Sequence, residues 1–105
     1  AYKVICMDNL RRRGSELNLL RLREHGAEFI HGDIRNSYDF PTGDEKVDCV
    51  IDAAAEPSVL AGLDGETDYL IQTNLNGTIN ALTFAKQRNA SFIFLSTSRV
   101  YPIQR

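Results

Sequence analysis

Three hydroxyl side chains, Ser96, Thr97 and Ser98, follow directly on the apolar run Phe92 to Leu95. A hydroxyl group both donates and accepts hydrogen bonds, and its donor can rotate toward the oxygen that needs it. Such a group can therefore bind an oxygen on which negative charge develops during a reaction. We expect chemistry of this kind here, with an ordinary strand-to-loop turn as the alternative.

Carboxylates stand at the ends of two further apolar runs. Asp8 follows residues 2–7, and Asp33 follows residues 27–31. A carboxylate at the end of a strand can accept hydrogen bonds from the hydroxyls of an adenosine ribose, and it repels a 2'-phosphate. Asp33 could instead accept from an adenine amino group while Ile34 packs on the ring. Either aspartate could equally be a turn cap.

Small, amide and basic side chains complete the candidate set. Ala53, Ala54 and Ala55 close a third apolar run, where small side chains would let the backbone approach a ligand or would simply pack. Asn74 falls on an apolar stripe of the longest helical pattern, and a buried amide must be hydrogen-bonded to protein or to ligand. Arg11 begins a basic turn, which is either solvated or able to reach a cofactor phosphate.

Histidine and cysteine give no sign of a metal site. His25 and His31 are separated by a predicted strand and have no evident partners, so surface or structural roles are expected. Cys6 and Cys49 lie far apart within apolar runs, and no Cys-x-x-Cys or His partner stands at metal spacing. Both cysteines are predicted to be buried, reduced thiols.

Alternating strands and helices must position these residues. Strands are predicted over 2–7, 27–31, 47–54 and 92–95, and helices over 15–26 and 66–88, with a crossover of at most one helical turn over 36–46. Ser15 is the predicted cap of the first helix and Gly26 its end. This order predicts an α/β fold with a parallel sheet, in which ligands gather beyond the carboxyl ends of the strands.

Two apolar helix faces are predicted to pack on that sheet. On the first helix the face comprises Leu17, Leu20 and Leu22, and on the second it comprises Ile71, Leu75, Ile79 and Leu82.

Composition places the chain among ordinary globular proteins. Its 105 residues suit one domain, with 43% hydrophobic residues, 25% charged residues and a net charge of -2. The sequence has no apolar run long enough to span a membrane and does not start with a signal-peptide pattern. We expect a cytoplasmic protein that binds neither nucleic acid nor a membrane.

Five motifs in register resemble one enzyme family. DNLRRRG, HGDIR, VIDAAAEPSV, NLNGT and FLSTSRVYP are similar, in order and spacing, to the extended short-chain dehydrogenases/reductases that act as nucleotide-sugar epimerases and dehydratases. AAEPSVLAG and STSRVYP are most similar to the CDP-tyvelose epimerase branch. The resemblance implies NAD as cofactor and a nucleotide-diphosphate sugar as substrate, and it is compatible with a homo-oligomer.

The resemblance also assigns roles to individual residues. Together with the residue types, it implies cofactor contacts at the strand ends and on the long helix, by Asp8, Asn9, Arg11, Asp33, Ile34, Ala53, Ala54, Ala55, Asn74 and Ser96. Thr97 matches the catalytic Ser/Thr and would polarise the reacting oxygen, and Ser98 would face the substrate. Dehydratases of the family carry Asp-Glu after this Thr, so the Ser98-Arg99 pair favours epimerisation by transient oxidation.

Two family elements have no match here. Tyr101 is not followed by a Lys four residues later, and the opening strand with its Gly-rich loop is not found. We therefore expect residues 1–105 to be an internal fragment of an NAD(P)-binding Rossmann domain, a partial doubly wound parallel sheet that is inactive alone. In the doubly wound order that opening strand would lie between strands 2–7 and 47–54. These two strands would either close on each other or flank a place for another chain.

Other functions remain open at this stage. A dehydratase or reductase of the same family is one alternative. A response-regulator receiver domain is another, with Asp52 as phosphoacceptor and Asp8 as a magnesium ligand. The third is a nucleotide-binding module without catalysis.

Overall fold

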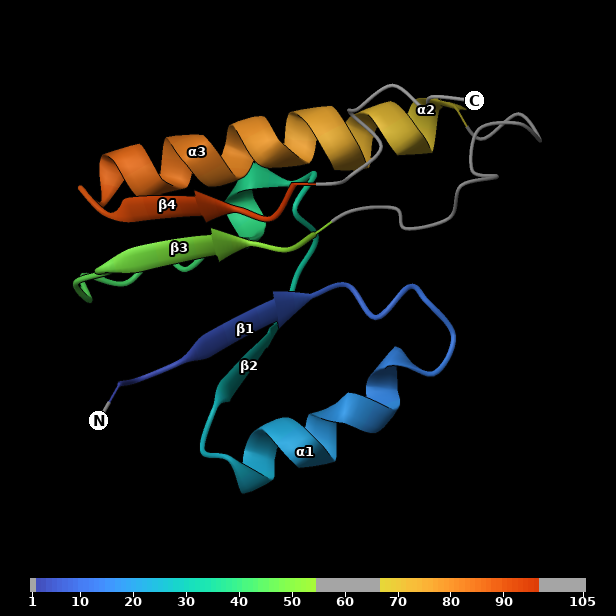
Figure 1. The fold of residues 1–105 in the computed structure, drawn as a ribbon, viewed down its shortest axis with the longest axis vertical. Helices are drawn as coiled ribbons and strands as arrows, with labels where there is room; N and C mark the ends of the chain where they lie inside the picture. Colours follow the sequence, from blue (N-terminus) through green and yellow to red (C-terminus); the bar gives the residue numbers. More distant parts are fainter. Residues whose placement is uncertain (1, 55–66, 97–105) are drawn as a thin grey trace, which may run out of the picture.

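The computed structural model describes residues 2–54 and 67–96 and shows an α/β fold (Figure 1). In chain order the elements are β1 (Ile5–Asp8), a 3-10 turn η1 (Ser15–Leu17), α1 (Asn18–Glu24), β2 (Glu28–His31), a 3-10 turn η2 (Ser37–Asp39), β3 (Cys49–Asp52), α2 (Thr67–Ile71), a π-helical segment η3 (Gln72–Asn76), α3 (Gly77–Gln87) and β4 (Ser91–Phe94). Each predicted strand and helix is present, and the α/β prediction is confirmed.

The strands form two parallel pairs, as expected of a partial Rossmann-like sheet. β1 pairs with β2, with Asp8 opposite His31, and β3 pairs with β4, with Asp52 opposite Phe94. Within the described residues β1 and β3 are not hydrogen-bonded to each other, although Figure 1 shows them running in the same direction. The two strands that would flank a central strand therefore do not close on each other.

Glycine ends α1 as its backbone freedom predicts. Gly26 adopts φ 75, the Gly26 N–H donates to Arg23 O at 3.1 Å and the Ala27 N–H donates to Leu22 O at 3.0 Å. This is the Schellman arrangement, which confirms Gly26 as the end of α1. Ser15 is not a helix cap, because Gly14 takes that position and Ser15 is the first residue of η1.

The long helix runs from α2 through η3 to α3, and its α3 part covers β3 and β4 (Figure 1). The face that it buries differs from the predicted one. Its buried residues recur every four positions and are small: Thr73, Gly77, Ala81 and Ala85. The predicted stripe faces outward, with exposed fractions of 48% for Ile71, 57% for Leu75, 51% for Ile79 and 47% for Leu82. Small side chains occupy the inner face because they allow the helix to pack closely against its neighbours. Asn74, predicted to be buried, is exposed.

Exposure also corrects two smaller predictions. Leu17 and Leu20 are exposed and Leu22 is half-buried, so α1 does not bury the predicted leucine face. The cysteines are reduced, but Cys49 is exposed and Cys6 only half-buried. Cys49 lies at the start of β3, where it shares an exposed face with Ile51, whereas Val50 and Asp52 on the other face are more buried.

In residues 2–54 and 67–96 no helix is long and apolar enough to cross a membrane.

Candidate functional site

A pocket of about 390 Å³ opens where β1 and β2 end. It is lined by Asn9, Arg11, His31, Gly32, Asp33, Arg35 and Asp39. Because β1 and β2 run parallel, their carboxyl ends reach the same edge, and the loops that follow them supply these side chains. The structure thus brings together three residues predicted from the sequence, Asn9, Arg11 and Asp33.

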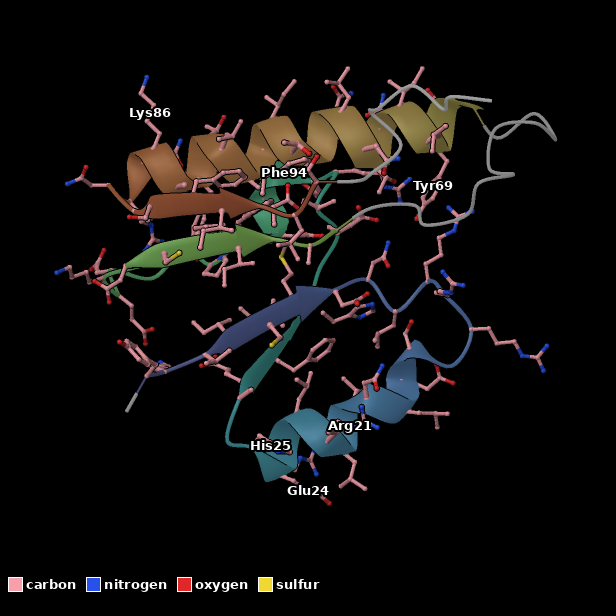
Figure 2. All side chains as sticks on the ribbon, in the orientation of Figure 1. Arg21, Glu24, His25, Tyr69, Lys86 and Phe94 are labelled. Atoms are coloured by element: carbon pink, nitrogen blue, oxygen red, sulfur yellow. The ribbon has the colours of Figure 1, made fainter. Side chains whose placement is uncertain are left out.

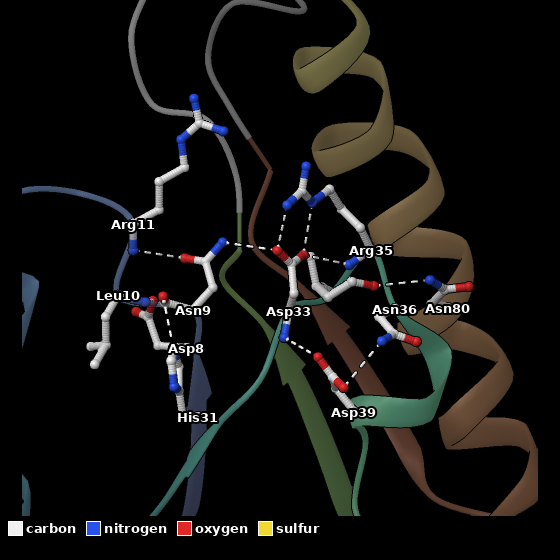
Figure 3. Close-up of polar contacts among 11 residues, drawn as sticks. Asp8, Asn9, Leu10, Arg11, His31, Asp33, Arg35, Asn36, Asp39 and Asn80 are labelled. Carbon is white, nitrogen blue, oxygen red and sulfur yellow. Dashed lines mark hydrogen bonds and ion pairs between the residues drawn. The ribbon is translucent and has the colours of Figure 1, made fainter.

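Asp33 is the most strongly engaged carboxylate in the pocket (Figure 3). Arg35 donates from Nε to Oδ1 at 2.9 Å and from Nη2 to Oδ2 at 2.6 Å, and the Arg35 backbone N–H also donates to Oδ1. Hydrogen bonding from Arg35 is the largest cause that lowers the pKa of Asp33, against the opposing effect of partial burial. Asp33 is therefore ionised at neutral pH.

Asn9 connects the two loops. Its Nδ2 donates to Asp33 Oδ2 at 3.2 Å, and its Oδ1 accepts from the Arg11 backbone N–H at 3.0 Å. Asp8 caps the same turn, because its Oδ1 accepts from the Leu10 N–H at 2.8 Å. The turn-cap role of Asp8 is thus present, and Asp8 itself is not among the residues that line the pocket.

The floor of the pocket is fixed by the turn after β2. Asp39 Oδ2 accepts from the Asp33 N–H at 2.9 Å, and Asp39 Oδ1 accepts from Asn36 Nδ2 at 3.2 Å. His31 Nε2 lies 3.1 Å from Asn9 O, so this ring connects β2 to the loop after β1. His31, Asp39 and Arg35 were not predicted as site residues.

Ile34 is contacted by residues of α3. Asn80 Nδ2 donates to Ile34 O at 2.9 Å (Figure 3). A Cβ at Gly77 would lie 2.7 Å from Ile34 Cγ2, so glycine is what allows α3 to approach this turn. These two contacts join the β1–β2 half of the molecule to the half that contains α3.

The remaining predicted positions lie away from this pocket. Ala53 and Ala54 are exposed after β3, Ser96 is exposed after β4, and Asn74 lies on the outer side of η3. Ala55, Thr97 and Ser98 lie outside the described residues.

Asp52 of β3 and Thr73 of η3 are the buried polar side chains of the described residues. Asp52 is 4% exposed and accepts from the Ala54 N–H at 3.0 Å through Oδ1. In the described part of the chain, Asp52 Oδ2 and Thr73 Oγ1 are buried without a hydrogen-bond partner. A phosphoacceptor must reach a phosphodonor from solvent, so the burial of Asp52 argues against the receiver-domain alternative. Residues 2–54 and 67–96 also hold no His, Cys, Asp or Glu cluster suited to a metal ion.

Comparison with known proteins shows the family of the chain. The model of the NAD dependent epimerase/dehydratase family matches residues 1–105. The chain is 36% identical over 104 residues to CDP-paratose 2-epimerase of Salmonella typhi, an alignment that covers 93% of this chain and 30% of that enzyme. The chain therefore spans less than a third of the length of this relative. On the family match over all its residues, the chain belongs to the NAD-dependent epimerase/dehydratase family.

Proposed function

We propose that this chain supplies the adenosine half of the cofactor site in an NAD-dependent nucleotide-sugar epimerase. The observation that carries the proposal is the pocket after β1 and β2, which joins Asn9, Arg11 and Asp33 at the strand ends. Its volume of about 390 Å³ is in the range of small-molecule sites. Family membership adds that proteins of this kind use NAD.

The residues of the pocket suit an adenosine group. The ionised Asp33 carboxylate accepts three hydrogen bonds from Arg35 and one from Asn9, which fills its roughly four lone-pair positions. A bound adenine would therefore take the place of one of these donors, and the 3.2 Å bond from Asn9 is the longest of the four. Asp33 would then accept from the adenine amino group, with Ile34 against the ring. Asp8 would use Oδ2 for the ribose hydroxyls, since its Oδ1 caps the turn.

The chemistry proposed for the whole enzyme is transient oxidation of a sugar. When bound, NAD would take a hydride from a sugar carbon and give it back on the other face. Thr97 would donate a hydrogen bond to the reacting oxygen as charge develops there. Ser96 would lie toward the cofactor and Ser98 toward the sugar. The small side chains of residues 53–55 would let the protein backbone come close to the cofactor.

Epimerisation is favoured over water elimination by one pair of residues. Elimination needs an acid and a base beside Thr97, and this chain has Ser98 and Arg99 there. The relative named CDP-paratose 2-epimerase supports a CDP-linked sugar as the substrate. A cytoplasmic location and a homo-oligomeric state stay predictions.

Cofactor binding is tested by calorimetric titration of the 105-residue chain with NAD. We expect micromolar binding that weakens about tenfold or more in Asp33→Asn, since a hydrogen bond to a charged group contributes about 1.5–3 kcal/mol. Asp44→Asn is the matched control, because Asp44 is exposed and lies outside this pocket. Equal affinities in both variants would contradict the assignment of the site.

Catalysis is tested on the product of the complete reading frame that encodes this chain. Incubation with NAD and a CDP-hexose in D₂O should invert one sugar carbon without incorporating solvent deuterium at it, because the hydride is returned rather than exchanged. Accumulation of a keto-deoxy sugar would indicate a dehydratase instead. Binding of NAD without either product would favour the non-catalytic nucleotide-binding module.

A further inference from the structure

The outer face of the long helix is apolar and exposed. It comprises Ile71, Leu75, Ile79 and Leu82, each about half exposed. Between Asp68 and Lys86 the helix carries no charged residue, so this face lacks the charges that usually solvate a surface helix. The exposed side of α1, by contrast, carries two arginines and a glutamate beside its leucines. An uncharged apolar face of this kind is typical of an interaction surface.

Opposite charges stand at the two ends of this outer face. Asp68 lies in the first turn of α2 and Lys86 in the last turn of α3, and both are exposed. Figure 2 shows the Lys86 side chain pointing away from β4. Among the described residues neither charge is in an ion pair. The pKa of Arg35 is raised chiefly by its hydrogen bonds to Asp33, and the charge of Asp68 contributes least to it.

The apolar and the charged positions share one centre, which is the level of Gly77 along the helix. Leu75 and Ile79 lie two positions before and after Gly77. Asp68 and Lys86 lie nine positions before and after it. A second copy whose helix packs antiparallel at this level brings each position opposite its counterpart, so unlike charges meet at both ends. A parallel copy would instead place Asp68 against Asp68 and Lys86 against Lys86.

We propose that the outer face of the long helix is a two-fold interface with a second copy of this chain, in which the two helices run antiparallel and meet at the level of Gly77. Leu75 and Ile79 of the two copies form its apolar centre, and a pair of Asp68 with Lys86 closes each end. The symmetry of the pattern selects a second copy over an unrelated partner, because a copy supplies the opposite charges at matching distances. The proposal does not need the cofactor site, and it gives the predicted homo-oligomer a surface and an orientation.

The apolar centre is tested by sedimentation of the product of the complete reading frame that encodes this chain. We expect a dimer whose dissociation constant rises at least about a hundredfold in Leu75→Glu, because two unpaired carboxylates would be buried at the centre of the interface. Leu17→Glu is the matched control, since it makes the same change at a residue of η1 that is 78% exposed. It should leave the dissociation constant within about twofold.

The orientation is tested by reversing the charges. Asp68→Lys alone and Lys86→Glu alone should each weaken the dimer about tenfold, because each places like charges together at both ends. The double variant restores unlike pairs and should bind within about threefold of the unsubstituted protein. Recovery of this kind requires the two positions to meet across the interface, which happens in the antiparallel dimer.

The outcomes separate the interface from the proposed function. A monomer that binds NAD would overturn the interface and leave the function, whereas a dimer that behaves as expected but binds no NAD would do the reverse. A dimer that persists in Leu75→Glu is held by another surface, such as the open strand edges, and overturns the proposal. If Leu75→Glu lowers the unfolding temperature of a monomer, another part of the same polypeptide covers this face and the proposal fails. A double charge variant that does not recover would overturn the antiparallel orientation.

Discussion

Arg35 binds the carboxylate of Asp33, two residues earlier in the chain, through both Nε and Nη2, at 2.9 and 2.6 Å. The pair lies where β2 ends, and Asn9 and Asp39 attach it to the loop after β1 and to η2. A forked, charge-assisted pair of this kind is among the stronger polar contacts in proteins. It makes the Asp33 carboxylate a fixed feature of the pocket rather than a mobile surface charge.

Replacing Arg35 should reveal, in the pH dependence of the free energy of unfolding, how much the Arg35–Asp33 pair stabilises the fold. Arg35 lowers the pKa of Asp33 in the folded chain, whereas an aspartate in the unfolded chain titrates near about 3.9. The stabilisation is therefore complete above about pH 4 and is lost as the pH falls further through the lower folded-state pKa. We expect Arg35→Gln to reduce the free energy of unfolding by about 1–3 kcal/mol at pH 7 and by less at pH 3, measured by urea unfolding.

An exposed ion pair provides the control for this experiment. Lys46 and Asp48 are 3.5 Å apart with side chains 86% and 79% exposed, so Lys46→Gln should change stability by less than about 0.5 kcal/mol. A loss in Arg35→Gln that is the same at pH 3 and pH 7 would show that Arg35 acts through packing and not through Asp33.

Gly77→Ala should destabilise the chain by about 1–3 kcal/mol, although alanine is the better helix former. The new Cβ would lie 2.7 Å from Ile34 Cγ2, which forces α3 and the turn after β2 apart. Thermal or urea unfolding measures the effect. Gly43→Ala is the control, since a Cβ there meets nothing within 4 Å. Adding Ile34→Ala should recover part of the loss, and an unchanged double variant would rule out this clash.

Thr73→Val should leave stability unchanged or raise it by up to about 1 kcal/mol. The Thr73 hydroxyl is buried without a partner in the described part of the chain, and valine has nearly the same shape without the polar atom. Thr83→Val in the same helix is the matched comparison, because the Thr83 hydroxyl donates to Ile79 O at 2.9 Å and is exposed. Marked destabilisation by Thr73→Val would mean that this hydroxyl has a partner in solution, such as a water molecule.

Asp8→Asn should shift the cofactor preference toward NADP. The carboxylate repels a 2'-phosphate, so its removal should reduce the preference in binding affinity for NAD over NADP by about tenfold. This corresponds to roughly 1.4 kcal/mol, which is the size of the repulsion between two neighbouring charges. Asparagine keeps the acceptor for the Leu10 N–H, which maintains the turn. The ratio of dissociation constants from calorimetry is the readout, and a ratio that does not move would place the ribose away from Asp8.

Local sequence signals predicted the elements and part of the site. Acidic residues after apolar runs located the strand ends, because β1 ends at Asp8 and β2 ends two residues before Asp33. Gly26 likewise located the end of α1. These features depend on neighbouring residues only. The buried face of α3 was not predictable in this way. Its large apolar side chains indicated a core, yet the close approach to Ile34 selects Gly77 and small residues instead.

The missed site residues depend on contacts across the fold. Arg35 stands within the HGDIR motif and two residues after Asp33, a spacing that could have suggested the pair. Tyr69 of α2, whose ring centroid lies 3.5 Å from the guanidinium carbon of Arg11, gives no such signal, because the two residues are far apart in the sequence. Asn80 likewise reaches Ile34 from a distant helix.

The open edges of β1 and β3 have a consequence for the chain in solution. Each strand is paired on one side only within the described residues, so its other side presents backbone N–H and C=O groups without strand partners. Such edges recruit strands from other molecules. The charges of Lys3 and Glu45, which join in an ion pair at 2.8 Å, oppose this pairing, but they lie before the first residues of β1 and β3 and leave the strands themselves open. The isolated chain should therefore self-associate as its concentration rises, and a short peptide that pairs with both edges should suppress this aggregation.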